Sequence, residues 1–193
     1  MRSFLASALV ASALVFASSP ARADISSWLA FGGGAGVERN GVVAGSNGAG
    51  VFSASMGVGS SPRKPFVVGG IFRSTTYVGL GTDVGIAARF ASGGFARGQW
   101  GGAFDLGVVA RPWRDGDYGR YPLQGVFLLG APWGFQAGLG VQAVNLGGSP
   151  TTFGGFAVLE IDILRLTVMR QGKTDLTWWN ASPVGGHLDE PSR

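Results

Sequence analysis

Isolated charged side chains recur within otherwise apolar stretches of the sequence, and they are the first candidates for chemistry. They are Asp83, Arg89, Arg97, Asp105, Arg111, Glu160, Asp162 and Arg165. Paired carboxylates can act as general acid and base, and a line of such groups can carry a proton or an ion. Arginines interleaved with carboxylates equally suit a buried structural network, because either charge alone is costly at low dielectric. We favour the structural network, in which Arg97 and Arg111 are expected to meet Glu160 and Asp162.

A hydrolase site of the Ser-His-acid kind needs a histidine held within hydrogen-bond reach of its nucleophile. The sequence has one histidine, His187, and it lies in a polar C-terminal segment beside Gly185 and Gly186. The simplest interpretation of such a histidine is a solvated side chain. Cysteine is absent, which removes disulfides, thiol catalysis and cysteine-rich zinc sites. We therefore expect no catalytic residue, no cofactor and no metal site.

A second group of charges has the composition of a surface loop. Asp115 and Asp117 flank a glycine and offer oxygens of the kind that calcium prefers, and arginines beside them suit phosphate groups. The further ligands and the distal glutamate of an EF-hand loop are missing, so a charged hairpin turn is the simpler interpretation. The candidate loop-binding residues are Trp113, Arg114, Asp115, Asp117, Tyr118 and Arg120.

Composition limits the fold that must position these groups. The chain has 193 residues, of which 46% are hydrophobic and only 13% are charged. This balance argues against disorder, and 35 glycines argue against an all-helical protein. The formal net charge is +4, and without Arg2 and Arg22 of residues 1–23 it falls to 13 against 11, or +2, which is too weak to indicate a nucleic-acid partner.

The first 23 residues have the features of a cleaved signal peptide. Arg2 supplies a positive start, an apolar stretch spans 4–17, and Ala21-Arg22-Ala23 has the small-x-small cleavage pattern. No later run of 18 apolar residues escapes interruption, so we expect no transmembrane helix in the exported chain.

Apolar and polar residues alternate with a period of two along the exported chain, which is typical of β-strands. We expect eight strands, at about 26–37, 49–58, 66–79, 82–91, 95–111, 121–130, 135–145 and 152–169. After Asp162 the alternation slips by one residue, which we interpret as a β-bulge.

The residue types in the two phases indicate which face meets water. One phase is apolar and, in the clearest strands, uncharged, as a lipid-facing wall requires. The other phase is mainly glycine, alanine, serine and glutamine with isolated charges, which suits the side-chain-filled interior of an eight-stranded barrel. The alternative is a soluble periplasmic barrel or sandwich that binds an apolar ligand, with the apolar phase inside.

On this pattern, the chain resembles the small eight-stranded bacterial outer-membrane barrels of the OmpA or OmpX type. The likeness covers about residues 26–169 and implies an antiparallel, up-and-down transmembrane β-barrel. Such barrels commonly end on a strand with a terminal aromatic residue, whereas this sequence ends in Glu190-Pro191-Ser192-Arg193. We expect a signal peptide over 1–23, a barrel over 24–170 and a C-terminal extension over 171–193.

The resemblance also implies where the protein acts and what it meets. It predicts location in the bacterial outer membrane, with membrane lipid, lipopolysaccharide and the barrel assembly machinery as partners. The tryptophans that lie near strand ends, Trp28 and Trp133 among them, are expected in an aromatic girdle at the lipid–water boundary. The expected role is structural or surface-binding and non-catalytic, with a barrel interior plugged by side chains.

Overall fold

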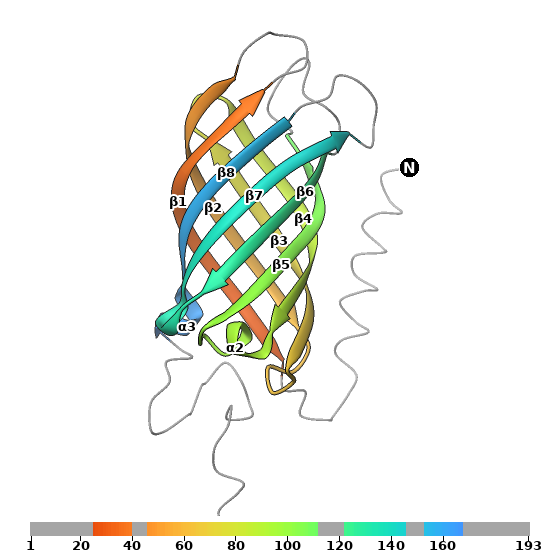
Figure 1. Ribbon diagram of the computed structural model, residues 1–193, viewed down its shortest axis with the longest axis vertical. Helices are drawn as coiled ribbons and strands as arrows, with labels where there is room; N and C mark the ends of the chain where they lie inside the picture. The colour runs from red at the N-terminus through yellow and green to blue at the C-terminus, as the bar shows by residue number, and fades with distance from the viewer. Residues whose placement is uncertain (1–24, 40–45, 112–121, 146–152, 168–193) are drawn as a thin grey trace, which may run out of the picture.

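Eight antiparallel strands form one closed up-and-down barrel, in which each strand pairs with its neighbours in sequence (Figure 1). The computed structural model describes residues 25–39, 46–111, 122–145 and 153–167. The strands are β1 (Ser26–Arg39), β2 (Asn47–Gly59), β3 (Phe66–Tyr77), β4 (Gly81–Ser92), β5 (Gly101–Ala110), β6 (Pro122–Gly130), β7 (Phe135–Asn145) and β8 (Phe153–Asp162). The prediction of an all-β, eight-stranded antiparallel barrel is confirmed.

The barrel closes where the first strand meets the last. β1 pairs with β8 over ten residues, from Ala30 opposite Asp162 to Arg39 opposite Phe153. This seam leaves no open sheet edge, because every strand is bonded on both sides. A register shift lies between Pro122 and Leu123 in the β6–β7 pair.

The strand expected over 95–111 starts later than predicted. A short helix, α2 (Gly93–Ala96), precedes it, and β5 begins only at Gly101. Ser92 caps α2, because its Oγ accepts the backbone N–H of Phe95 at 3.2 Å and also that of Gly102 at 3.2 Å. Small and larger residues also alternate through α2 and the turn after it, so a period of two does not show where β5 begins.

The last strand ends earlier than predicted, at Asp162, and α3 (Ile163–Thr167) follows it. The Asp162 carboxylate accepts the backbone N–H of Leu164 at 3.0 Å and that of Arg165 at 3.4 Å, which is how an aspartate begins a helix. The slip of phase after Asp162 therefore marks the change from strand to helix, and its interpretation as a bulge is wrong.

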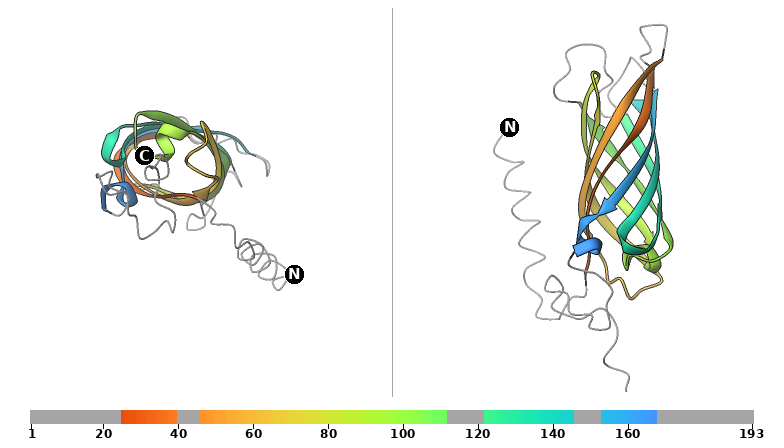
Figure 2. Two further views of the ribbon diagram at one scale, coloured as in Figure 1. Left: turned by 90° about the horizontal axis from the view of Figure 1, so that it is seen from below. Right: turned by 90° about the vertical axis from the view of Figure 1, so that its left-hand side faces the viewer.

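The two ends of the barrel are built differently. At one end lie α2, α3 and the short 3-10 helix η1 (Pro132–Gly134), and α2 lies across the barrel end in the view from below (Figures 1 and 2). We call this the α2 end. At the opposite end β3 passes into β4 through a tight turn, in which Leu80 N–H donates to the Tyr77 carbonyl and Gly79 has φ of +78°. A side chain is disfavoured at that φ, so glycine suits the turn.

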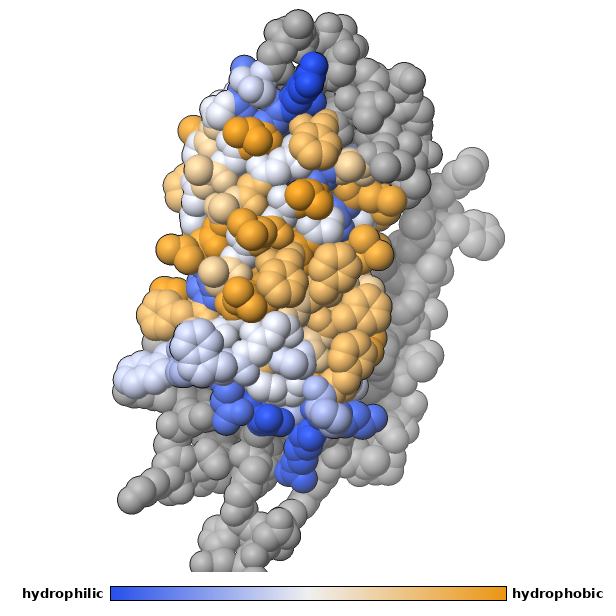
Figure 3. All heavy atoms as spheres, in the orientation of Figure 1, coloured by the Kyte–Doolittle hydropathy of each residue, from blue (hydrophilic) through white to orange (hydrophobic). Residues whose placement is uncertain are grey.

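Side chains alternate between the interior and the outside along each strand. On the face in view, apolar residues cover the middle of the barrel and hydrophilic residues lie toward both ends (Figure 3). Ile86 and Leu159, for example, are 67% and 73% exposed, whereas Arg89 and Glu160 are buried. The polar phase therefore faces inward, as predicted. Within the described residues, no helix is long and apolar enough to cross a membrane.

Candidate functional site

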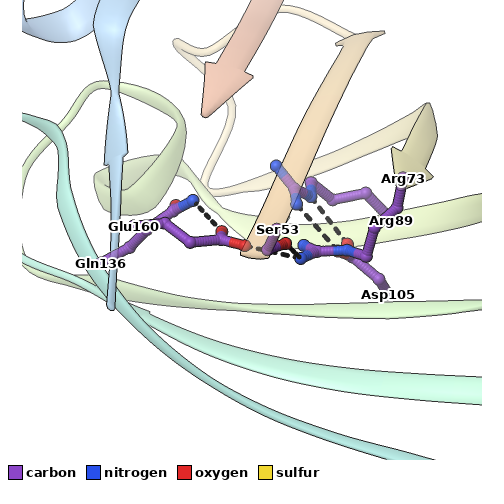
Figure 4. A network of polar contacts seen from close by, with 6 residues as sticks. All are labelled: Ser53, Arg73, Arg89, Asp105, Gln136 and Glu160. Carbon is purple, nitrogen blue, oxygen red and sulfur yellow. Dashed lines mark hydrogen bonds and ion pairs between the residues drawn. The ribbon is translucent and has the colours of Figure 1, made fainter. Parts of the chain in front are cut away.

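Six side chains from six strands form a polar network inside the barrel (Figure 4). They are Ser53, Arg73, Arg89, Asp105, Gln136 and Glu160, which we call the six-residue network. Arg73 joins its halves, because it donates to Glu160 at 2.8 Å, to Asp105 at 3.1 Å and to Ser53 at 2.9 Å. Arg89 binds Asp105 through two parallel hydrogen bonds of 2.7 and 2.8 Å. Two guanidinium groups thus balance two carboxylates.

A second network lies toward the opposite end, around Arg111. Its guanidinium donates to both carboxylate oxygens of Asp83 and, at 2.7 Å, to Glu38. Gln142 donates to Asp83 at 2.8 Å. We call Glu38, Asp83, Arg111 and Gln142 the Arg111 network. It ties β1, β4 and β7 to the residue that follows β5.

Aromatic rings cover one arginine of each network, Arg89 and Arg111. The Arg89 guanidinium lies 5.0 Å from the ring of Trp28 and 5.5 Å from that of Phe95, and Arg111 lies 5.3 Å from the ring of Tyr77. Contact with a ring face stabilises a desolvated cation. Each guanidinium is therefore held by carboxylates on one side and by a ring on another.

Inward-facing glycines make room for these rings. A Cβ on Gly69 would lie 2.8 Å from the ring of Trp28, and a Cβ on Gly140 would overlap the ring of Phe156. Phe156 in turn meets Tyr77 edge-on, with ring centroids 6.3 Å apart. The abundance of glycine in this sequence thus has a packing reason at these positions, because a narrow barrel can hold a large ring only opposite a missing side chain.

An ion pair lies at the α2 end. Asp162 and Arg165 approach to 3.8 Å, and Arg165 also donates to the Ser27 carbonyl at 3.2 Å. Burial lowers the pKa of the Arg165 guanidinium, whereas the Asp162 carboxylate opposes that shift. The guanidinium remains charged, because its pKa starts far above neutrality.

The structure pairs the predicted charges differently from our expectation. Arg97 lies just beyond α2, where it donates to the Pro62 carbonyl at 3.0 Å, and it is not part of either network. Arg111 meets Asp83 and Glu38 instead of Glu160 and Asp162. The reason is position along the strands, because Arg111 follows the end of β5 that is remote from Glu160. The remaining predicted residues, Asp83, Arg89, Asp105, Glu160, Asp162 and Arg165, are buried in ion pairs.

Two charged members of the networks, Arg73 and Glu38, were not among the predicted network residues. Arg73 lies on the same face of β3 as Ile71 and Tyr77, which are apolar. Because the inward phase was recognised by its small and polar residues, the alternation did not mark Arg73 as inward-facing. Glu38 ends the phase that starts at Trp28 and passes through small residues, so continuing that alternation would have placed it inside.

The expected tryptophan girdle is partly wrong. Trp28 is only 3% exposed and fills the barrel interior. Trp100 and Trp133 lie at the α2 end and are 76% and 62% exposed. The phase of Trp28 faces inward, where Gly69 leaves space for its ring.

Several predicted features lie outside the described residues. They are the signal peptide over 1–23, the candidate binding loop with Trp113, Arg114, Asp115, Asp117, Tyr118 and Arg120, the histidine His187, and the segment 171–193.

The arrangement of the networks favours a structural role. Each of the five carboxylates in the described part of the chain lies within ion-pair distance of an arginine. In that same part, no group of three or more histidine, cysteine or acidic side chains is placed to hold a metal ion.

Comparisons with protein-family models, with curated proteins and with solved structures find no match to this chain.

Proposed function

We propose that this protein is a bacterial outer-membrane β-barrel of the small OmpA or OmpX type, with a structural or loop-presenting role and no catalytic activity. The observation that carries the proposal is the inverted arrangement of its side chains. All five described carboxylates are buried inside, whereas large apolar residues such as Phe52, Ile86 and Leu159 are exposed on the outside. Charge inside and apolar groups outside stabilise a barrel whose surroundings are hydrocarbon.

The strand lengths support the same proposal. The eight strands contain between 9 and 14 residues. A tilted strand of about 9–11 residues is long enough to cross the hydrocarbon core of a bilayer. A closed barrel also satisfies the backbone hydrogen bonds that a membrane leaves without water.

The filled interior favours a structural role over transport. Ion pairs and rings occupy the barrel at three levels, around Arg89, around Arg111 and around Arg165. Eight strands leave room only for such side chains, so we propose that the barrel conducts no solute. We therefore propose that the outer surface and the connections between strands carry the function of the protein.

The alternative is a periplasmic barrel that holds an apolar ligand. Such a protein needs an apolar interior. Arg73, Asp105 and Glu160 lie buried in this interior and disfavour that alternative.

Fractionation combined with gel mobility tests the proposal. The full chain is expressed in a bacterium, its outer membrane is separated, and the band is compared with and without boiling in detergent. We expect an outer-membrane band whose mobility changes on boiling, because a barrel remains folded in detergent until it is heated. A periplasmic band with the same mobility before and after boiling would overturn the proposal.

A further inference from the structure

Charge on the outside of the described barrel has a single sign. Its exposed charged residues are Arg39, Arg63 and Lys64, and Arg97 is half-buried. All the carboxylates of the same part of the chain are inside. An ordinary solvated surface mixes both signs, so this surface is suited to an anionic partner.

Three of these four cations gather at one corner of the α2 end. The Arg97 guanidinium donates to the Pro62 carbonyl at 3.0 Å, and the Gly93 N–H donates to the Pro65 carbonyl at 2.8 Å. These bonds fasten the turn between β2 and β3 to α2. We call Arg63, Lys64 and Arg97 the basic corner.

The basic corner borders the apolar outer surface. Phe66 follows Lys64 by two residues, is 55% exposed, and stacks with Phe90 at a centroid distance of 6.2 Å. Trp100 and Trp133 are also exposed at this end. Cations next to outward rings match the boundary of a bilayer, where phosphates lie just outside the acyl chains.

We propose that the basic corner binds the phosphate groups of anionic membrane lipids at the α2 end of the barrel. The inference rests on the proposed function, because it places the apolar surface in a bilayer. Arginine and lysine recognise phosphate through charge-assisted hydrogen bonds. The corner would therefore select anionic over zwitterionic lipid and hold the barrel at a set depth.

Native mass spectrometry of the full chain tests the inference. The protein is refolded in detergent micelles that contain equal amounts of phosphatidylglycerol and phosphatidylcholine, and bound lipids are counted. Each cation near an anionic surface is worth about a fivefold change in the binding constant. We expect Arg63→Gln/Lys64→Gln to lose most of the preference for phosphatidylglycerol, by about tenfold or more.

Three control variants separate charge from folding and from position. Arg63→Lys/Lys64→Arg keeps both charges and should keep the preference. Arg39→Gln removes a cation outside the corner and should leave the preference of the corner intact. If the double variant fails to refold, Lys64→Gln alone should still lower the preference about fivefold.

The outcomes distinguish this inference from the proposed function. A mobility change on boiling in pure phosphatidylcholine vesicles reports the barrel alone, and its loss would overturn the proposed function. A normal mobility change with no preference for phosphatidylglycerol, or an equal preference in the double variant, would overturn only the inference. Displacement of the lipid by inorganic phosphate, but not by chloride of equal ionic strength, would assign the corner to free phosphate and overturn it as well.

Discussion

Arg73 and Glu160 are joined by a 2.8 Å ion pair across the barrel interior, although 87 residues separate them in sequence. Arg73 also contacts Asp105, so one guanidinium links β3 to both β5 and β8. Such a network forms only when the barrel has closed, because β8 must first return to β1. The Arg73–Glu160 pair therefore stabilises the complete barrel, whereas the Arg89–Asp105 pair already forms within the β4–β5 hairpin.

Removal of the shared carboxylate should destabilise the barrel strongly. Asp105→Asn leaves Arg73 and Arg89, both buried, with one charged partner fewer, which we expect to lower the free energy of unfolding by about 3–5 kcal/mol. Urea titration of the refolded protein, followed by tryptophan fluorescence, measures this change. Arg39→Gln serves as the exposed control and should leave the midpoint unchanged. Equal midpoints for both variants would show that the six-residue network does not hold the barrel.

The glycine opposite Phe156 should be needed for packing. In Gly140→Ala the new Cβ overlaps the Phe156 ring, and we expect a loss of about 1–3 kcal/mol. Gly70→Ala is the matched control, since a Cβ at Gly70 has no neighbour within 4 Å. Adding Phe156→Leu to Gly140→Ala should recover part of the loss. Equal losses in both alanine variants would point to backbone entropy instead of ring packing.

Two buried hydroxyl groups should respond in opposite ways. Ser53 accepts a hydrogen bond from Arg73 at 2.9 Å, so Ser53→Ala should cost about 1.5–3 kcal/mol. The buried Thr75 hydroxyl has no hydrogen-bond partner among the residues that the structure describes, so Thr75→Val should be neutral or stabilising. The same urea titration compares the two variants. A larger loss in Thr75→Val would contradict this ranking.

A charge on the outer surface should impair membrane assembly. Leu106 is exposed on the outside of β5, and we expect Leu106→Arg to cost about 2–4 kcal/mol if it lies near the bilayer midplane. Asn47→Arg, at the start of β2, places the same charge at an exposed polar position and should be tolerated. The fraction of protein with heat-dependent mobility after refolding into vesicles reports assembly. Equal fractions for the two variants would count against a lipid-facing Leu106.

Most of the fold could be predicted, because the alternation of apolar and polar residues marks the strands and the face on which each side chain lies. Period two placed Asp83, Arg89 and Glu160 on the inward phase, and the resemblance to small up-and-down barrels implied that each strand lies beside its sequence neighbours. The partners of each charge were not predictable in this way. These partners depend on the register between neighbouring strands, which sets how far along the barrel each side chain lies. The alternation of apolar and polar residues does not determine that register. Arg111 was consequently assigned to the wrong carboxylates.

The ends of the strands and the positions of the aromatic rings could also not be predicted from the alternation of apolar and polar residues. Ser92 and Asp162 cap short helices through hydrogen bonds to backbone N–H groups three or fewer residues away. Both residues also fit a strand in the alternation, so their capping role becomes visible only in three dimensions. The inward placement of Trp28 depends on Gly69 of another strand, a pairing that no local pattern contains.

The central claim is that the apolar outer surface faces lipid, and single-cysteine labelling tests it most directly. The chain has no cysteine, so one introduced thiol gives an unambiguous signal. Ile86→Cys lies on the outer surface at a position 67% exposed in the protein alone, and Lys64→Cys lies in an exposed turn. In cells, a water-soluble maleimide should label Lys64→Cys much faster than Ile86→Cys once the outer membrane is made permeable to the reagent. Equal labelling of the two thiols in the folded protein would contradict a membrane-embedded barrel.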